Sequence, residues 1–320
     1  MKTGLRVSVA IPLYNEEQII PELLRRVCTV LDEIPGGPHE VVLVDDGSSD
    51  RTFEIVARAA AQESRILAIS LSRNFGHQSA VSAALDNVTG DVVIVMDGDL
   101  QDSPDAIHDF IREYNLGFDV VYAQRIGRKE GRLLRLCYFL FYRLIALFSN
   151  VRLPLDAGDF ALLSRRVVEE LRCLPEHHRY LRGLRAWVGF RQIGIQVERS
   201  ERFIGKTKYS FIKLFGLAFN GIFAFSLIPL RVATVFGLLT ILCSGIFAAY
   251  SVYVRVLLGQ SPQGFTALIL VMTFLSGIQL LFLGVIGEYL GRVYEETKGR
   301  PHYIVGKVVG RCYSGRRIRP

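Results

Sequence analysis

Two carboxylates, Asp97 and Asp99, flank a glycine directly after an apolar run, and the amide Gln101 follows two residues later. The run at 92–96 (VVIVM) has the mainly β-branched composition of a buried strand, and Gly98 would let the chain turn sharply after it. Carboxylate and amide oxygens are the ligands that hard divalent cations prefer in proteins. Asp and Gly are also ordinary turn formers, so the motif alone predicts either a metal site or a turn.

Strand-like runs alternate with helix-like segments through the first part of the chain, and each run ends in polar residues. Strands are expected at residues 7–11, 41–44, 66–71, 92–96 and 120–123. This alternation predicts βαβ crossovers and an α/β fold with a Rossmann-like, mostly parallel sheet. Ligands bind such sheets at the carboxyl ends of the strands. We therefore expect one crevice to collect Asn15, Asp46, Asn74, Asp97, Asp99 and Arg125.

The chemistry of this crevice excludes two common nucleotide-binding classes. Neither GxxxxGKS nor GxGxxG follows the first strand, which argues against a P-loop NTPase and against a Rossmann dehydrogenase. The acids, the amide and the arginines suit a nucleotide diphosphate that is held through a metal ion and by hydrogen bonds to its base and ribose.

The distribution of charge predicts a membrane protein. The chain is 50% hydrophobic with a formal net charge of +7, yet 232–254 and 265–287 contain no charged residue. About 20 apolar residues span a bilayer core, so both stretches qualify as transmembrane helices, with a buried core hairpin as the alternative. Lys and Arg flank the pair, which places both termini and the large domain in the cytoplasm at the inner (plasma) membrane. Basic residues beside apolar spans indicate a bilayer rather than nucleic acid.

Other segments are predicted to lie along the membrane surface. A helix at 133–148 keeps arginines within an aromatic and aliphatic run, which favours an interfacial helix over a core helix. Residues 206–231 are expected to form a basic loop and a second interfacial helix, and 288–320 a basic cytoplasmic tail. The large domain would then occupy residues 1–205.

Three motifs together resemble the glycosyltransferases of family 2 that have the GT-A fold: PLYNE at 12–16, VDDGS at 44–48 and DGDLQ at 97–101. With the two C-terminal spans, the chain is most similar to polyprenyl-phosphate glycosyltransferases, which include dolichyl-phosphate mannose synthases and bacterial undecaprenyl-phosphate glucosyltransferases. The resemblance implies metal-dependent, inverting transfer of a hexose, with glucose from UDP-glucose favoured, to a polyprenyl phosphate. A GDP-mannose or UDP-amino-pentose donor stays open, and so does a homo-oligomer.

The resemblance also implies roles for individual residues. Asp97, Asp99 and Gln101 would hold Mg²⁺ or Mn²⁺ at the diphosphate, and Asp97 would also lie at the donor nucleotide. The other donor-nucleotide residues would be Pro12, Tyr14, Glu16 and Asp46. The acceptor phosphate would be bound by Arg125, Arg128, Arg143 and Lys206. Arginine suits a phosphate because its guanidinium donates two hydrogen bonds at once. For each arginine, a surface or interfacial charge is the alternative.

A further motif, DAGDF at 156–160, matches the acceptor-side acid motif of the family, which makes Asp156 and Asp159 candidate bases beside Arg125. A phosphate acceptor is already ionised at neutral pH, so proton removal should add little to the rate. The more demanding task is to position two anions for in-line attack, with inversion following from a single displacement. One of the acids could instead orient an arginine or the sugar.

Two other readings compete with the enzyme. RGLRAW at 182–187 partly echoes the QxxRW motif of processive polysaccharide synthases, but the Gln is replaced and two spans are too few for a polymer channel. A membrane-anchored binding protein that has lost the chemistry would not need the intact acids and Arg125. Spans without charged residues argue against an ion pathway.

Overall fold

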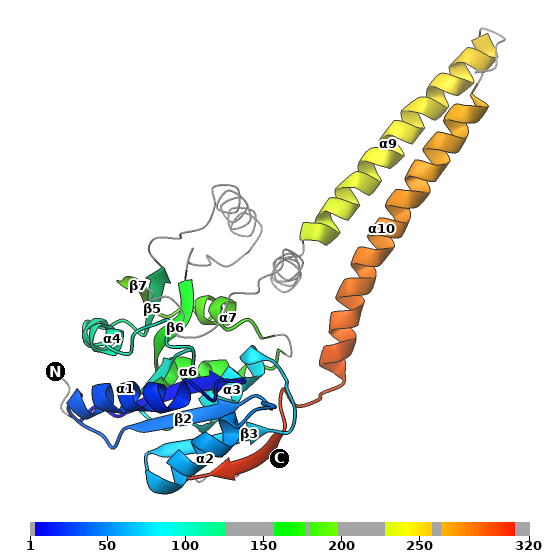
Figure 1. Cartoon of the computed structure of the whole chain (residues 1–320). Helices are drawn as coiled ribbons and strands as arrows, with labels where there is room; N and C mark the ends of the chain where they lie inside the picture. Colours follow the sequence, from blue (N-terminus) through cyan, green and yellow to red (C-terminus); the bar gives the residue numbers. More distant parts are fainter. Residues whose placement is uncertain (1–3, 126–156, 177–178, 198–227, 258–263, 311–320) are drawn as a thin grey trace. The chain divides into compact units, whose positions relative to one another are not determined.

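The computed structural model (Figure 1) describes residues 4–125, 157–176, 179–197, 228–257 and 264–310. The chain divides into two compact units, and each is considered separately. The first contains the described residues up to 197 together with 300–310, and the second contains 228–257 and 264–299.

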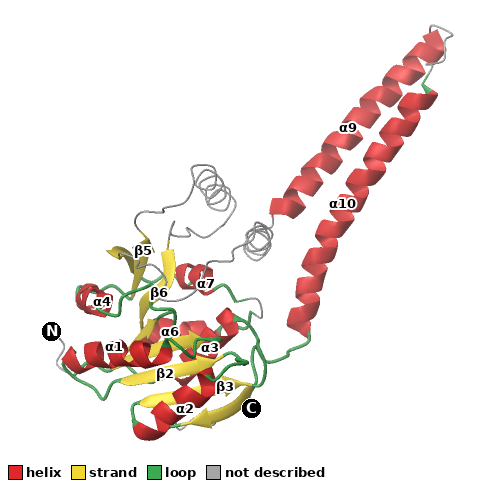
Figure 2. Cartoon of the chain, in the orientation of Figure 1, coloured by secondary structure: helices red, strands yellow, loops and turns green. Residues whose placement is uncertain are grey.

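The first unit is built on one eight-stranded sheet with the order β7-β5-β6-β4-β1-β2-β3-β8. Figure 2 shows these strands with helices packed on them. The strands are β1 (Val7–Leu13), β2 (Glu40–Asp45), β3 (Ile66–Leu71), β4 (Val92–Val95), β5 (Val120–Arg125), β6 (Ala157–Ser164), β7 (Gln192–Val197) and β8 (Val305–Val309).

The sheet is mixed but mostly parallel, which agrees with the fold predicted from the sequence. Four pairings are parallel (β1–β2, β1–β4, β2–β3 and β5–β7), and three are antiparallel (β4–β6, β5–β6 and β3–β8). β6 lies between β4 and β5 and runs against both. The beginning of β6 therefore lies at the same sheet edge as the carboxyl ends of β4 and β5.

Helices cover both faces of this sheet. They are α1 (Ile20–Glu33), α2 (Thr52–Gln62), α3 (His77–Asn87), α4 (Ala106–Asn115), α6 (Arg165–Cys173) and α7 (Leu181–Trp187). α1, α2 and α4 pack on one face, and α3, α6 and α7 pack on the other. Successive strand residues alternate between the two faces, and both layers are apolar, so the central strands β1 to β4 are buried on both faces and are mainly apolar.

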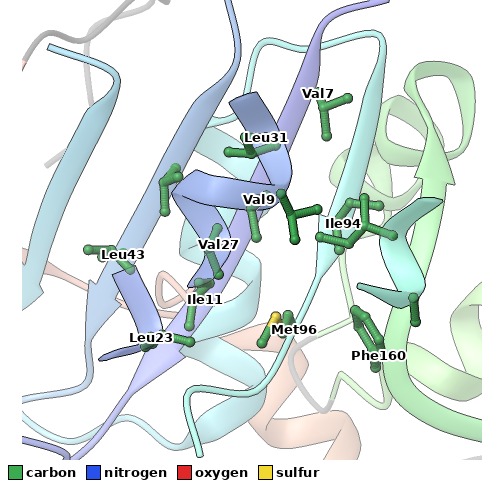
Figure 3. Close-up of a cluster of buried hydrophobic side chains, with 14 of the residues drawn as sticks. Val7, Val9, Ile11, Leu23, Val27, Leu31, Leu43, Ile94, Met96 and Phe160 are labelled. Carbon is green, nitrogen blue, oxygen red and sulfur yellow. The ribbon is translucent and has the colours of Figure 1, made fainter. Parts of the chain in front are cut away.

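The core on the α1 side forms because the apolar residues along one side of α1 pack on those residues of β1 and β4 that point to this face of the sheet. Figure 3 shows this contact, which is made by six fully buried side chains: Leu23, Val27, Leu31, Val9, Ile11 and Ile94. Each such burial contributes about 1.5–3 kcal/mol. On the same face, the Phe110 and Phe160 rings lie 4.7 Å apart and join α4 to β6.

The C-terminal segment differs from the predicted basic tail at 288–320. The helix before it continues to Thr297, and β8 then pairs antiparallel with β3. Ser72 donates a backbone hydrogen bond to Ile304 O (2.8 Å), and Tyr303 Oη donates to Asp86 Oδ2 at the end of α3 (2.7 Å). Five residues at 305–309 were too few to distinguish an edge strand from a tail by periodicity.

The second unit is a helical hairpin of α9 (Ile228–Leu257) and α10 (Phe265–Thr297), which contact each other. Each contains a stretch long and apolar enough to cross a membrane, Val232–Tyr250 and Val271–Thr297. Large apolar side chains on both helices are exposed, among them Leu238 at 63% and Phe274 at 69%. The predicted interfacial helix at 133–148 lies outside the described residues, as does 206–227 from the predicted basic loop and second interfacial helix.

Candidate active site

The loops after β1 and β2 are joined to each other by hydrogen bonds. Asn15, which has a left-handed backbone conformation (φ 55°), accepts a hydrogen bond from Ser49 N through Oδ1 (2.9 Å). Ser48 Oγ accepts from Asn15 N (2.9 Å), and Thr52 Oγ1 accepts from Glu16 N (2.9 Å). These bonds fix the backbone around the predicted donor site.

The predicted donor residues take different positions along this edge. Pro12 is buried within β1, and the Tyr14 ring beyond the strand is 48% exposed. An aromatic ring on the crevice edge is free to stack on a base.

Asp46 is buried at the end of β2 and anchors the loop between β3 and α3. Its Oδ1 accepts a hydrogen bond from Phe75 N (2.8 Å) and its Oδ2 accepts from Gly76 N (2.9 Å). Burial raises the pKa of Asp46, and these two hydrogen bonds only partly oppose the shift. Asp46 therefore fixes the loop that leads into the first residue of α3.

That first residue, His77, meets two acids from neighbouring strands. His77 Nε2 lies 3.7 Å from Oδ1 of Asp97, which follows β4. Asp159 lies near the start of β6, and one ligand atom from each of the three residues falls within 4.8 Å of the others. The antiparallel direction of β6 creates this group, because it brings Asp159 to the carboxyl edge of β4.

The turn after Asp97 differs from the expectation for Gly98. Gly98 has no left-handed φ; instead it lies close to β1, where an added Cβ would lie 2.5 Å from Leu13 Cδ2 and would force that side chain to shift. The left-handed residue is Leu100, with φ 54°. Asp99 Oδ1 accepts a hydrogen bond from Gln101 N (3.2 Å), so Asp99 and Gln101 share a turn beside the group of three.

Asp97 and Asp159 have different pKa values because their surroundings differ. Burial, with the nearby charges of Asp159 and Asp99, raises the pKa of Asp97 to about 6, although His77 opposes the shift. Burial would also raise the pKa of Asp159, but hydrogen bonds and charge from Arg182 outweigh it and lower the pKa to about 2. Arg182 Nε donates to Asp159 Oδ1 at 2.6 Å, and its Nη2 donates to Oδ2.

The donor set of this group fits a divalent cation. Carboxylates and an imidazole suit Mn²⁺ and, through the oxygens, Mg²⁺. Asp97 is the better ligand because both oxygens of Asp159 already accept hydrogen bonds from Arg182.

A pocket adjoins the group on the α3 side of the sheet. Its polar lining includes His77, Gln78, Asp159, Arg182 and Arg185, and its apolar lining comes from β4, β6, α3, α6 and α7. Arg185 is 4% exposed, and burial lowers its pKa to about 10. It therefore remains a cation at neutral pH.

The predicted acceptor residues are mostly outside the described part of the chain. This holds for Asp156, Arg128, Arg143 and Lys206. Arg125 is the last residue of β5, and because β4 and β5 both run against β6, its backbone lies at the same edge as Asp97.

Sequence reasoning did not assign His77, Arg182 or Arg185 to the crevice. His77 directly follows the exit loop of β3, so the rule that placed Asn74 there would have included it. Arg182 and Arg185 were noticed only as part of an imperfect motif, and their position depends on how α7 packs against β6.

The crevice at the carboxyl edge of a mixed sheet, with acids after β4 and at the start of β6, is that of a GT-A glycosyltransferase. The family model described as glycosyl transferase family 2 matches residues 8–172. The chain belongs to this family and is a glycosyltransferase.

Similar proteins extend this match along almost the whole chain. An uncharacterised glycosyltransferase of Synechocystis sp. is 40% identical over 97% of this chain and 97% of its own length. A prophage bactoprenol glucosyl transferase homolog of Escherichia coli is 37% identical over 95% of this chain and 99% of its own length. Among solved structures, glucosyl-3-phosphoglycerate synthase from Mycobacterium tuberculosis with Mn²⁺, UDP-glucose and phosphoglyceric acid is 19% identical, covers 69% of this chain and 78% of its own, and has a TM-score of 0.48.

Proposed function

We propose that this protein transfers glucose from UDP-glucose to the phosphate of a polyprenyl phosphate, with inversion at the anomeric carbon, at the cytoplasmic face of the inner membrane. The observation that carries the transfer chemistry is the group of Asp97, His77 and Asp159 at the carboxyl edge of the sheet. It offers a divalent cation and a sugar-nucleotide diphosphate one place to bind.

The lipid acceptor is supported by the relatives and by the hairpin. The Escherichia coli relative, named as a bactoprenol glucosyl transferase homolog, matches 95% of this chain, so the match extends beyond the catalytic unit. The exposed apolar faces of α9 and α10 need an apolar medium, and a bilayer supplies one. We therefore place two spans in the membrane and the catalytic unit in the cytoplasm.

In this proposal Asp97, Asp99 and Gln101 hold Mg²⁺ or Mn²⁺. When bound, the cation offsets the negative charge of the leaving diphosphate. The base and ribose of the donor are bound by Pro12, Tyr14, Glu16 and Asp46. Arg125, Arg128, Arg143 and Lys206 bind the acceptor phosphate.

The acceptor-side acids have separate roles in this proposal. Asp159 orients Arg182, because a carboxylate with a pKa of about 2 that accepts two hydrogen bonds from a guanidinium is a poor proton acceptor. Asp156 is the remaining candidate base. The rate should depend little on either as a base, since the acceptor phosphate is already ionised.

The test is transfer with purified full-length protein in detergent. It is incubated with polyprenyl phosphate, Mg²⁺ or Mn²⁺, and labelled UDP-glucose, GDP-mannose or a UDP-amino-pentose. Labelled glycolipid from UDP-glucose is expected, and it should depend on the metal and be lost in Asp99→Ala. Glycolipid from another donor would change the assigned sugar, and intact nucleotide binding without any transfer would refute the proposal in favour of a binding protein.

A further inference from the structure

Arg185 is a buried cation with too few partners. Its side chain is 4% exposed, and its one hydrogen bond to a described residue runs from Nη2 to Gly158 O at 3.4 Å, which is long. Nε has no hydrogen-bond partner among the described residues. The guanidinium lies 5.2 Å from the centroid of the Tyr122 ring, a contact that satisfies none of its N–H donors. Buried polar groups are normally hydrogen-bonded, so this residue needs an explanation.

Other arginines of the same unit show what a structural role requires. Arg172 donates to Leu85 O and Val88 O, with Nε and Nη2 each 2.7 Å from an acceptor. Arg165 donates from Nη1 to Val88 O at 3.2 Å and from Nη2 to Gly90 O. Both tie α6 to the end of α3 and the segment after it through carbonyl oxygens. Arg185 makes no comparable set of bonds.

Arg185 shares a nearby acid, Asp159, with Arg182. The charge of Asp159 acts on Arg185, but both of its oxygens already accept hydrogen bonds from Arg182. Asp159 therefore has no oxygen that is not already hydrogen-bonded to another guanidinium. Both arginines line the pocket beside His77, next to Asp97. An anion that enters the pocket would supply the missing acceptors.

We propose that Arg185, supported by Arg182, is an anion-binding residue whose guanidinium, including the unpartnered Nε–H, donates hydrogen bonds to a phosphoryl oxygen of a reactant. The inference rests on the proposed function, which supplies two sources of such an oxygen: the diphosphate of the donor and the phosphate of the acceptor. Arg185 would hold the phosphoryl group beside Asp97, His77 and Asp159, where a bound divalent cation would offset its negative charge from the other side.

The variants are Arg185→Met, which keeps an unbranched but shorter side chain and removes the charge, and Arg185→Lys, which keeps the charge but lacks the planar guanidinium. Arg191→Gln is the control because Arg191 is exposed and packs on the Phe118 ring outside the pocket. Replacing an unpaired buried charge with an apolar residue is often neutral or stabilising. We therefore expect Arg185→Met to melt at the temperature of the wild type or above it.

Binding is measured first, with the full-length protein in detergent and UDP or pyrophosphate as the probe. The increase in melting temperature that saturating probe produces should fall by at least half in Arg185→Met, and should be unchanged in Arg191→Gln. Initial-rate kinetics then separate the sources. If the donor diphosphate is bound, the KM for UDP-glucose rises about tenfold, and if the acceptor phosphate is bound, the KM for polyprenyl phosphate does.

A structural role gives a different pattern. A lower melting temperature in Arg185→Met with normal probe binding and normal KM values would overturn the inference. Should Arg185→Met not fold, Arg185→Lys decides: roughly a fivefold or greater rise in one KM supports anion binding, since Lys cannot donate a fork, and no change refutes it. Loss of probe binding in Arg185→Met would support the inference even if the wild type transferred no sugar, so the two proposals fail separately.

Discussion

The two sides of the crevice use their acids differently. After β1, β2 and β3, side-chain oxygens accept hydrogen bonds from backbone N–H groups, as Asp46 does from Phe75 and Gly76. After β4 and at the start of β6, Asp97 and Asp159 meet basic side chains: Asp97 faces His77, and Asp159 is paired with Arg182. The hydrogen bonds of the first side fix the conformation of the loops, and the acids of the second side carry the charge of the site.

This difference appears in the pKa values. Asp97 and Asp159 are neighbours in the same buried region, yet the pKa is raised to about 6 in one and lowered to about 2 in the other. The Arg182 guanidinium accounts for the contrast. Separation of this kind between two carboxylates assigns them different roles.

The largest effect is expected from Arg182→Gln, because it leaves Asp159 buried without its partner. Breaking a buried pair on one side costs about 3–5 kcal/mol of the free energy of unfolding. Thermal melting measures the loss, and the double variant with Asp159→Asn should recover most of it by removing the unpaired charge. Equal stability of Arg182→Gln and wild type would show that the pair is not structural.

Asp97→Asn should reduce kcat/KM by about 100-fold, equivalent to about 2.7 kcal/mol, while the protein stays folded. Asp97 is the acid expected to hold both metal and diphosphate, and the amide removes the charge without changing the shape. The rate of metal-dependent sugar transfer measures this reduction in kcat/KM. Asp109→Asn is the control, because the Asp109 side chain lies on the solvent side of α4 and is 51% exposed. Activity within twofold of the control would exclude Asp97 from the site.

Asp46→Asn tests the other side of the comparison. The amide can accept only one of the two backbone hydrogen bonds, so stability should fall by about 1–3 kcal/mol. Because the loop that carries His77 loosens, the KM for the donor should rise as well. Melting and donor titration measure the two effects. A loss of activity at unchanged stability would mean that Asp46 acts on the ligand alone.

The dependence of stability on pH should have opposite signs for the two acids. Folded Asp97 keeps its proton up to about pH 6, against 3.8 for an ordinary aspartate, so its contribution falls as the pH rises through that window. Asp159, lowered from 3.8 to about 2, contributes above the ordinary value and loses its contribution as the pH falls toward 2. Melting without metal between about pH 4 and 7 should be flatter in Asp97→Asn than in wild type. Identical profiles would contradict the assigned shift.

The smallest effect is expected where the C-terminal segment meets α3. Tyr303→Phe removes the hydrogen bond to Asp86 and should cost about 0.5–1.5 kcal/mol. Tyr294→Phe, exposed on α10, is the matched control. If both variants melt at the same temperature, the bond to Asp86 does not hold the segment in place.

The local pattern of the sequence was sufficient to predict β1 to β5, the edge that collects Asp97, Asp99 and Asp46, and the two long apolar helices. Periodicity and composition are local properties, and the carboxyl ends of parallel strands must meet at one edge. The tertiary structure decided what depends on pairing between distant segments: β6 inserted against β4, β8 added beside β3, and α7 packed so that Arg182 and Arg185 reach Asp159. Strand order and helix packing follow from contacts over long sequence separations, which local periodicity does not encode. For this reason the position of Asp97 and Asp99 at this edge was predictable from the sequence, and the position of Arg182 and Arg185 beside Asp159 was not.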